Sequence, residues 1–286
     1  MQGGKVWVMG QQVLLRSTDG VNWFNAVANL RHEGSFAVSS VTQDFGGLRI
    51  FARNRNGLRC YGWDEWDLSW KVLFSVPTSS PGVFAAWTDR GLVMVARHND
   101  VPDIVCTASA SGDCQKWQSA FPGVAVHMQM APSGVGLCSV WGINNTAEDL
   151  HPIPSAAYFT NDAGMTWQLA GTLETHLVAG ATVDDLTSLV GGTEGFLALI
   201  DHGGIKNFSK ESGGCIEAVD VQGPHQVAVI ESEDEPPIQS LLARTGSGQW
   251  LRYGVGFDGH VACAKSLGSG NCLVCTRQTI YKCRFK

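Results

Sequence analysis

The chain has 286 residues, enough for one large domain with a substantial core, and a formal net charge of −6. The acidic balance argues against a dedicated nucleic-acid surface, and no run of 18 apolar residues is present to span a membrane. Only 16% of the residues are charged, whereas glycine (34) and tryptophan (10) are frequent, which is typical of an all-β protein with many turns. The first residues lack the apolar segment of a secretory signal, so we expect synthesis in the cytoplasm without export by that route.

The first strong motif is a predicted tight turn between two strands. An apolar run at 13–15 leads into Ser17-Thr18-Asp19-Gly20, and Trp23 follows. Asp19 is expected to accept hydrogen bonds from backbone amides, and Gly20 to supply a position with positive φ. Trp23 would open the next strand and bury its ring under the turn.

The same order of hydroxyl, Asp, Gly and Trp returns at 160–167, with Asp162, Gly164 and Trp167 in the corresponding roles. This second motif resembles the Asp-box, S/T-x-D-x-G-x-T-W, and the first resembles a variant that is one residue shorter. The Asp-box occurs in sialidases, sortilin-type receptors, photosystem assembly factors and many bacterial and phage proteins. The resemblance implies a β-propeller in which each box joins the third and fourth strands of a blade.

Degenerate copies of the box recur along the chain, each ending in an aromatic residue. These residues are Trp23, Trp70, Trp117, Trp167, Phe208 and Trp250, at spacings of 47, 47, 50, 41 and 42. This is the length of a four-stranded blade, and strands are predicted at 36–41, 48–53, 58–62 and 70–74 and at 124–130, 135–141, 156–160 and 166–170. We therefore predict an all-β fold, a single β-propeller domain over 1–286 with four-stranded antiparallel blades. We favour seven blades over six, closed by pairing of the N- and C-terminal strands.

The chain has nine cysteines, and this odd number leaves at least one thiol free. Several lie within apolar strand patterns, so we predict reduced, buried cysteines. Cys272 and Cys275 form a CxxC, but no second CxxC or nearby His completes a zinc set. If 277–278 is the turn of a hairpin at 271–285, Cys272 lies opposite Cys283. A disulfide between them is the less favoured alternative.

The predicted binding face carries three long polar connections between second and third strands, at 97–103, 142–152 and 231–237. In propellers this face lies opposite the box turns. The candidate binding residues are His98, Asn99, Asp100, Asp103, Asn144, Asn145, Glu148, Asp149, His151, Glu233, Asp234 and Glu235. Ordinary solvated loops are the alternative. A Ca²⁺ site from Asp100, Asp103, Glu148 and Asp149 lacks a fixed ligand spacing, so we expect no metal and no cofactor.

Two further clusters have alternative interpretations. Trp63, Trp66 and nearby carboxylates have the composition of a carbohydrate platform, but Trp66 and Trp70 fall where the box needs rings, which favours the core. The arginines of 49–59 (Arg49, Arg53, Arg55 and Arg59) are suited to gripping a carboxylate or phosphate, or lie exposed on a turn without a special role.

The sialidase resemblance implies catalysis by an arginine triad, a Tyr–Glu pair and an acidic residue. The family motif F/Y-R-I-P is absent before the first box, and Leu48-Arg49-Ile50-Phe51 is only a faint echo. Nucleophile-elbow, zinc-protease and phosphate-loop motifs are also absent. We therefore expect no enzyme but a structural or adhesive subunit of a large assembly, most readily a phage virion, with other protein subunits as partners. A glycan- or receptor-binding lectin is the alternative, and a sialidase-like glycoside hydrolase is less favoured. Nucleic acid and membrane insertion are not expected.

Overall fold

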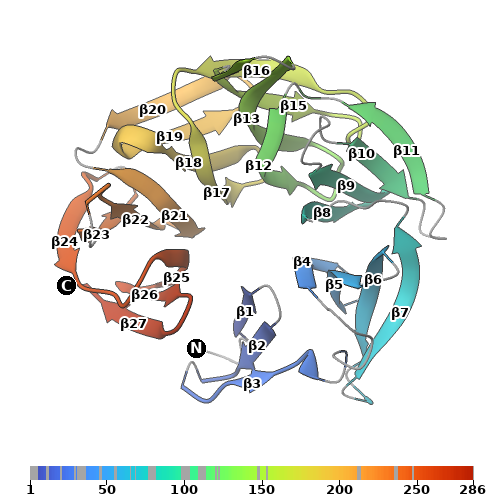
Figure 1. The fold of residues 1–286 in the computed structure, drawn as a ribbon, viewed down its shortest axis with the longest axis horizontal. Coiled ribbons are helices and arrows are strands. Elements are labelled where there is room, and N and C mark those ends of the chain that lie inside the picture. The colour runs from blue at the N-terminus through green and yellow to red at the C-terminus, as the bar shows by residue number, and fades with distance from the viewer. Residues whose placement is uncertain are drawn as a thin grey trace. The chain divides into compact units, whose positions relative to one another are not determined.

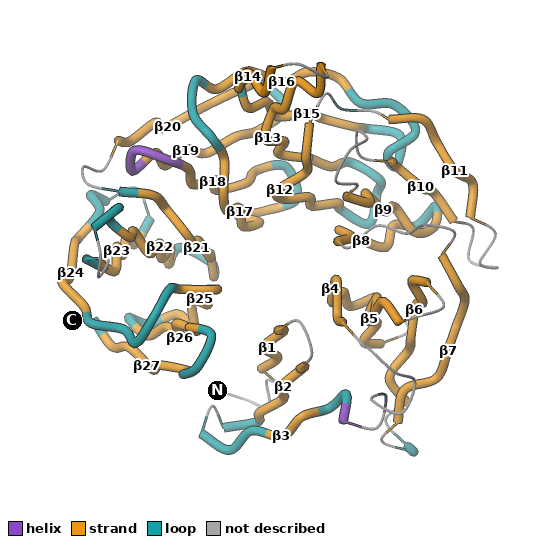
Figure 2. The backbone as a smooth tube through the Cα atoms, viewed as in Figure 1, coloured by secondary structure: helices purple, strands orange, loops and turns teal. Residues whose placement is uncertain are grey.

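The structure is a computed structural model, and it describes residues 6–285 apart from residues 11–12, 20, 29, 31–36, 45–46, 55–56, 65, 68, 77–81, 98–103, 109–113, 120, 122, 147–148, 153, 211–213, 235–237 and 247. In this part of the chain the regular structure is almost all β-strand, in seven antiparallel sheets (Figure 1; Figure 2). No helix among these residues is long and apolar enough to cross a membrane. The chain forms two compact units, residues 1–120 and 121–286, which are described in turn.

The first unit holds three sheets with the strand orders β1-β2-β3, β4-β5-β6-β7 and β8-β9-β10-β11. Its strands are β1 (Val6–Gly10), β2 (Val13–Ser17), β3 (Phe24–Asn25), β4 (Ala37–Asp44), β5 (Gly47–Asn54), β6 (Gly57–Asp64), β7 (Ser69–Val76), β8 (Gly82–Thr88), β9 (Gly91–Arg97), β10 (Ile104–Ala108) and β11 (Cys114–Ser119). Strands adjacent in sequence pair, as short connections favour.

Alternation along β5 divides its apolar side chains between two cores. Ile50 packs with Leu14 of β2 and with Val27, which follows β3, whereas the next residue, Phe51, packs with Met94 of β9. All five side chains are fully buried, and each contributes roughly 2–3 kcal/mol of hydrophobic stabilisation. Both faces of β5 are therefore buried at this point.

The second unit holds four sheets, with the orders β12-β13-β15-β16, β17-β18-β19-β20, β21-β22-β23-β24 and β25-β26-β27, and β14 pairs only with β13. Its strands are β12 (Gly123–Met130), β13 (Gly136–Thr146), β14 (Asp149–Pro152), β15 (Ser155–Thr160), β16 (Gln168–Leu173), β17 (Leu177–Asp184), β18 (Thr187–Gly192), β19 (Phe196–Asp201), β20 (Gly204–Lys210), β21 (Cys215–Gln222), β22 (His225–Glu231), β23 (Gln239–Thr245), β24 (Leu251–Val255), β25 (Val261–Gly268), β26 (Asn271–Thr276) and β27 (Ile280–Arg284). A short 3₁₀ helix, η2 (Thr193–Gly195), links β18 to β19.

The sheets of the second unit pack face to face through alternating side chains. On β22, Val229 packs with Val274 of the last sheet, and Ile230 packs with Leu197 of the sheet before. The first strands neighbour one another in order, β12 with β17, β17 with β21 and β21 with β25. The ends of these first strands, and the connections next to them, therefore lie close to those of the neighbouring sheet.

The predicted all-β class and the four-stranded antiparallel sheets are confirmed. The four strands expected at 36–74 and the four at 124–170 occur within a few residues of their predicted limits, apart from the longer β13. The C-terminal hairpin is also present, with Cys272 opposite Cys283, and the cysteines whose side chains are described are free thiols. The single domain, the ring closure and the number of blades stay predictions.

Candidate functional site

The aspartate of the 160–167 turn is used entirely by its own turn. Asp162 accepts the Thr166 N–H at 2.8 Å and the Thr166 hydroxyl at 2.6 Å, and the Thr160 hydroxyl donates to it at 2.8 Å. Gly164 has a φ of +79°, and its carbonyl accepts the indole N–H of Trp167 at 3.1 Å. Burial opposes ionisation of Asp162, but the hydrogen bonds outweigh it and hold its pKa below the usual value.

The first turn uses Asp19 in the same way. Its Oδ1 accepts the N–H groups of Val21 and Asn22, both at 2.8 Å, and the Asn22 side chain donates to Oδ2 at 2.7 Å. These hydrogen bonds hold the pKa of Asp19 far below its usual range, and the bond from the Asn22 backbone has the largest effect. Trp23 is half-buried, and Gly20 lies outside the described residues. A carboxylate so engaged stabilises a turn and is a poor proton donor.

The prediction that Trp66 lies in the core is wrong. Trp70 is buried, donates its indole N–H to the Ala26 carbonyl at 2.9 Å, and meets Trp63 edge to face at 5.0 Å. Trp66 instead lies at the tip of the β6–β7 turn, where it is 96% exposed. Asp64 accepts its N–H at 2.9 Å and thereby fixes the turn. An indole ring exposed in this way is suited to contact a ligand or another protein.

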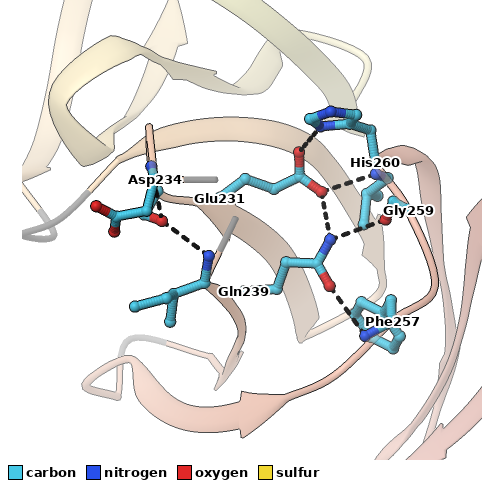
Figure 3. Close-up of polar contacts among 9 residues, drawn as sticks. Glu231, Asp234, Gln239, Phe257, Gly259 and His260 are labelled. Atoms are coloured by element: carbon cyan, nitrogen blue, oxygen red, sulfur yellow. Dashed lines mark hydrogen bonds and ion pairs between the residues drawn. The ribbon is translucent and has the colours of Figure 1, made fainter. Parts of the chain in front are cut away.

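A network of hydrogen bonds in the second unit lies where β22 ends and β23 begins, at one of the predicted binding connections. The Glu231 side chain is 5% exposed, and its Oε1 accepts the Val261 N–H at 2.8 Å and the Gln239 side chain at 2.7 Å. Its Oε2 contacts Nδ1 of His260 at 3.0 Å (Figure 3). Gln239 also bonds the Gly259 carbonyl at 2.9 Å. Glu231 and Gln239 therefore hold the connection between β24 and β25 in place.

Exposed groups surround this buried carboxylate. His260 is 69% exposed at its side chain, and Glu233 and Asp234 are exposed in the connection that follows Glu231. Burial, followed by the nearby charge of Glu217, raises the pKa of the Cys215 thiol to about 12, so this thiol is neutral and a poor nucleophile. We call residues 231–234, 238–239 and 257–261 the β22–β25 surface.

The other predicted binding residues are placed only in part. His98, Asn99, Asp100, Asp103, Glu148 and Glu235 lie outside the described residues. Asn144 and Asn145 lie on β13 and Asp149 and His151 on β14, where Asn144 pairs with His151 and Thr146 with Asp149. The predicted loop is thus largely a β-hairpin that extends β13 beyond its sheet. Among the described residues no group of His, Cys, Asp and Glu could hold a metal ion.

The arginine cluster of β5 and β6 is not available as a whole. Arg49 lies over the ring of Trp87, 5.7 Å from its centroid. Such a contact uses the guanidinium face for packing. Arg55 lies outside the described residues, as does the side chain of Arg53.

Sequence reasoning missed a buried polar network between β12 and β18. Gln129 donates to the Asp184 carbonyl at 3.0 Å and accepts the Ser188 hydroxyl at 2.9 Å. His127, two residues earlier on β12, has its Nε2 buried without a partner among the described residues, although part of the residue is exposed. Burial lowers the pKa of His127 to about 4, although a hydrogen bond with Gln129 opposes this. Its signal was the pair of polar residues in an apolar strand, His127-Met128-Gln129.

Comparison with known proteins adds the fold. No protein-family model and no curated protein matches the sequence. Solved structures do match, and three of them are each 12% identical to this chain. The GH74 enzyme of Niastella koreensis is 12% identical with a TM-score of 0.70, over 99% of this chain and 50% of that one. The GH74 xyloglucanase of Xanthomonas campestris is 12% identical with a TM-score of 0.69 and the same coverage. YCF48 of Cyanidioschyzon merolae is 12% identical with a TM-score of 0.61, over 94% of this chain and 88% of that one.

These neighbours are β-propeller proteins, and the chain has a propeller-type all-β fold. The chain spans about half the length of the two GH74 enzymes. The neighbours include enzymes, but likeness at 12% identity shows the fold alone.

Proposed function

We propose that this protein is a non-catalytic binding propeller that docks another protein subunit through the β22–β25 surface. The observation that carries the proposal is Ile238. Its side chain is 68% exposed, beside the exposed carboxylates of Glu233 and Asp234. The Ser232 hydroxyl accepts the Ile238 N–H at 2.8 Å, which fixes the position of the apolar side chain. An apolar side chain fixed in this way near charged groups is suited to serve as one contact of a protein interface.

The chemistry of the buried carboxylates supports binding rather than catalysis. A glycosidase needs a pair of carboxyl groups, one of which delivers a proton to the substrate. Both oxygens of Glu231 are occupied within the protein. Asp220, another buried carboxylate, accepts Lys265 at 2.9 Å and the Ser266 N–H at 2.7 Å, although burial raises its pKa. Neither carboxylate is placed to serve a substrate.

We place this binding propeller in a larger assembly, with a phage virion as the preferred setting. In such an assembly the acidic rim favours a partner with a basic or amide-rich surface, because opposite charges steer the encounter and fix the register. The exposed imidazole of His260 adds a second polar contact at the same surface.

The test compares two single variants in the native source. Ile238→Glu places a charge in the proposed contact, and Leu251→Glu places one on β24, where Leu251 is 56% exposed. Each tagged chain is purified under native conditions, and the stoichiometry of the co-purifying subunits is measured by mass spectrometry. We expect Ile238→Glu to lose the partner and Leu251→Glu to keep it. Equal stoichiometry for both variants, or turnover of xyloglucan or a fluorogenic sialoside by the unaltered chain, would contradict the proposal.

Glycan binding through Trp66 is a second candidate. Asp64 accepts the backbone N–H of Trp66, and Lys71 bridges Asp64 and Asp67, so the turn that presents the exposed indole is fixed and carries groups that can bond sugar hydroxyls. A glycan array with the unaltered chain and with Trp66→Ala tests it. Val21→Ala, at another exposed turn residue, is the matched control. Glycan signals that persist in Trp66→Ala would remove this candidate.

A further inference from the structure

The last sheet, β25-β26-β27, contains two pairs of cysteines that face each other across neighbouring strands. Cys272 of β26 is the register partner of Cys283 of β27, and Cys275 of β26 is the partner of Cys263 of β25. Cys272 and Cys275 are three residues apart, so their side chains lie on opposite faces of the sheet and the two pairs are separate. All four are free thiols.

The geometry of the Cys272–Cys283 pair suits a disulfide. Directly opposed residues of antiparallel strands have Cα atoms about 4.5–5.5 Å apart, within the range of about 4.4–6.8 Å found for disulfides. The β26–β27 ladder is regular at this pair, whereas the register next to Cys263 is shifted between Val261 and Cys263. The two thiols also interact electrostatically, because the neighbouring Cys283 raises the pKa of Cys272 and the neighbouring Cys272 lowers that of Cys283. The regular pair is therefore the better candidate.

The two thiols of the pair differ in reactivity. Cys272 is fully buried, and Cys283 is partly exposed on the outer strand. The interaction with Cys272 lowers the pKa of Cys283 against the opposing effect of burial, which favours the thiolate form of Cys283 over that of Cys272. Lys282 and Arg284 flank it along the strand, and both are exposed. A partly exposed thiol with a lowered pKa beside a buried thiol is the arrangement of an attacking and a resolving cysteine.

We propose that Cys272 and Cys283 are a modification site, a reversible disulfide that ties β27 to β26 and is formed by a low-molecular-weight disulfide such as oxidised glutathione. The Cys283 thiolate attacks one sulfur of the oxidant, its S–S bond breaks, and one glutathione leaves as a thiolate. Cys272 then loses its proton and attacks the Cys283 sulfur, and the second glutathione leaves. Two protein thiols are oxidised by two electrons, and one external disulfide is reduced to two thiols.

The bond would act on an edge strand of this sheet. Among the described strands β27 pairs with β26 alone. Closing the short segment between Cys272 and Cys283 restricts the unfolded chain and resists fraying of this strand. The inference does not depend on the proposed docking surface, which lies on other residues.

The test equilibrates the reduced full chain with oxidised glutathione and maps its peptides without reduction. Trypsin is expected to separate 266–277, which carries Cys272 and Cys275, from 283–284, which carries Cys283. We expect these peptides to be linked, fragmentation to assign the bond to Cys272, and the thermal midpoint to rise by on the order of 5 °C. Cys275→Ser should behave like the unaltered chain.

Cys272→Ser provides the second arm. Without the resolving thiol it should accumulate a mixed disulfide of Cys283 with one glutathione, detected by intact mass. A chain whose 266–277 and 283–284 peptides stay unlinked at equilibrium would overturn the proposal, as would a bond assigned to Cys263 and Cys275. The mapping of the unaltered chain stands even if a variant folds poorly.

Discussion

Replacing His127 by leucine should remove most of the acid sensitivity of the second unit between pH 6.5 and pH 4. The imidazole lies between β12 and β17 so closely that a methyl group added at Gly180 would meet its Cβ at 2.5 Å. Its Nε2 is buried and has no partner among the described residues. Protonation of His127 is therefore disfavoured in the folded chain. A leucine of similar volume leaves no polar atom unpaired at this position.

The magnitude follows from the pKa. Burial lowers the pKa of His127 from 6.5 to about 4, and a tenfold change in proton affinity corresponds to about 1.4 kcal/mol, so protonation opposes folding by about 3 kcal/mol. The unfolded chain binds this proton below about pH 6.5, and the folded chain binds it only below about pH 4. The free energy of unfolding therefore falls as the pH drops through this window, and His127 adds no further change below it.

Urea unfolding at several pH values between 7.5 and 4 measures this difference. At pH 7.5 His127→Leu should lie within about 1 kcal/mol of the unaltered chain, because the loss of the hydrogen bond with Gln129 is offset by removal of the buried Nε2, which has no partner among the described residues. By pH 4 the variant should be the more stable by about 3 kcal/mol. His202→Gln, at an exposed ring that contacts Phe159, is the control and should parallel the unaltered chain.

Parallel pH curves for His127→Leu and the unaltered chain would refute this reasoning. An NMR titration of the His127 ring gives an independent answer. A measured pKa near 6.5 would mean that the imidazole is hydrated in the folded protein.

Three further substitutions test the turns and the β22–β25 surface. Asp162→Ala removes a charged acceptor of three hydrogen bonds and should lower the free energy of unfolding by about 2 kcal/mol in urea titrations, whereas Asp185→Ala, in an exposed turn, should change it by less than about 0.5 kcal/mol. Gly214→Ala places a Cβ 1.9 Å from the Glu231 carbonyl at a φ of +140° and should lower the free energy of unfolding by about 2 kcal/mol or more. Gly256→Ala, at a position with open space, is its control, and equal thermal midpoints for the two variants would contradict this expectation. Glu231→Gln should cost about 1–3 kcal/mol in the same titrations, because a neutral amide oxygen accepts the Gln239 and Val261 bonds more weakly than a carboxylate and an NH2 group replaces the oxygen that faces His260. An unchanged value would mean that the β24–β25 connection is held by other contacts.

The strands were predictable because their signals are local. The alternation that separates Ile50 from Phe51, and the turn residues around Asp162, act over two to five residues. The position of Trp66 depends on register instead. Trp63 pairs with Trp70 across β6 and β7, which leaves Trp66 in the turn between them, where it cannot reach the core. Aligning the copies of the Asp-box by their aromatic residues does not show which of these residues falls in the turn.

From the sequence alone, the acidic residues at the end of β22 and after it indicate one solvent-exposed connection. Glu231 continues the period of two that runs through Val227 and Val229, the side chains that face the last sheet. Its carboxylate is buried for that reason, while Glu233 is exposed. The alternation could have identified Glu231, but its partners Gln239 and Val261 depend on packing between two sheets. The β13–β14 hairpin was missed because Asn144-Asn145-Thr146 is polar on both faces and has no apolar alternation to mark a strand.

The clearest motifs in this sequence are those with the least free chemistry. Asp19, Asp162 and Glu231 all accept backbone N–H groups, and in each case the carboxylate replaces a partner that an irregular backbone would otherwise lack. Such groups determine stability, so their variants should lose folding before binding. Ile238 and Trp66 contribute little to any core, so their variants should lose binding with stability unchanged. A ligand whose affinity falls only in the exposed variants would therefore locate the functional surface, and the stability measurements on the carboxylate variants provide the control.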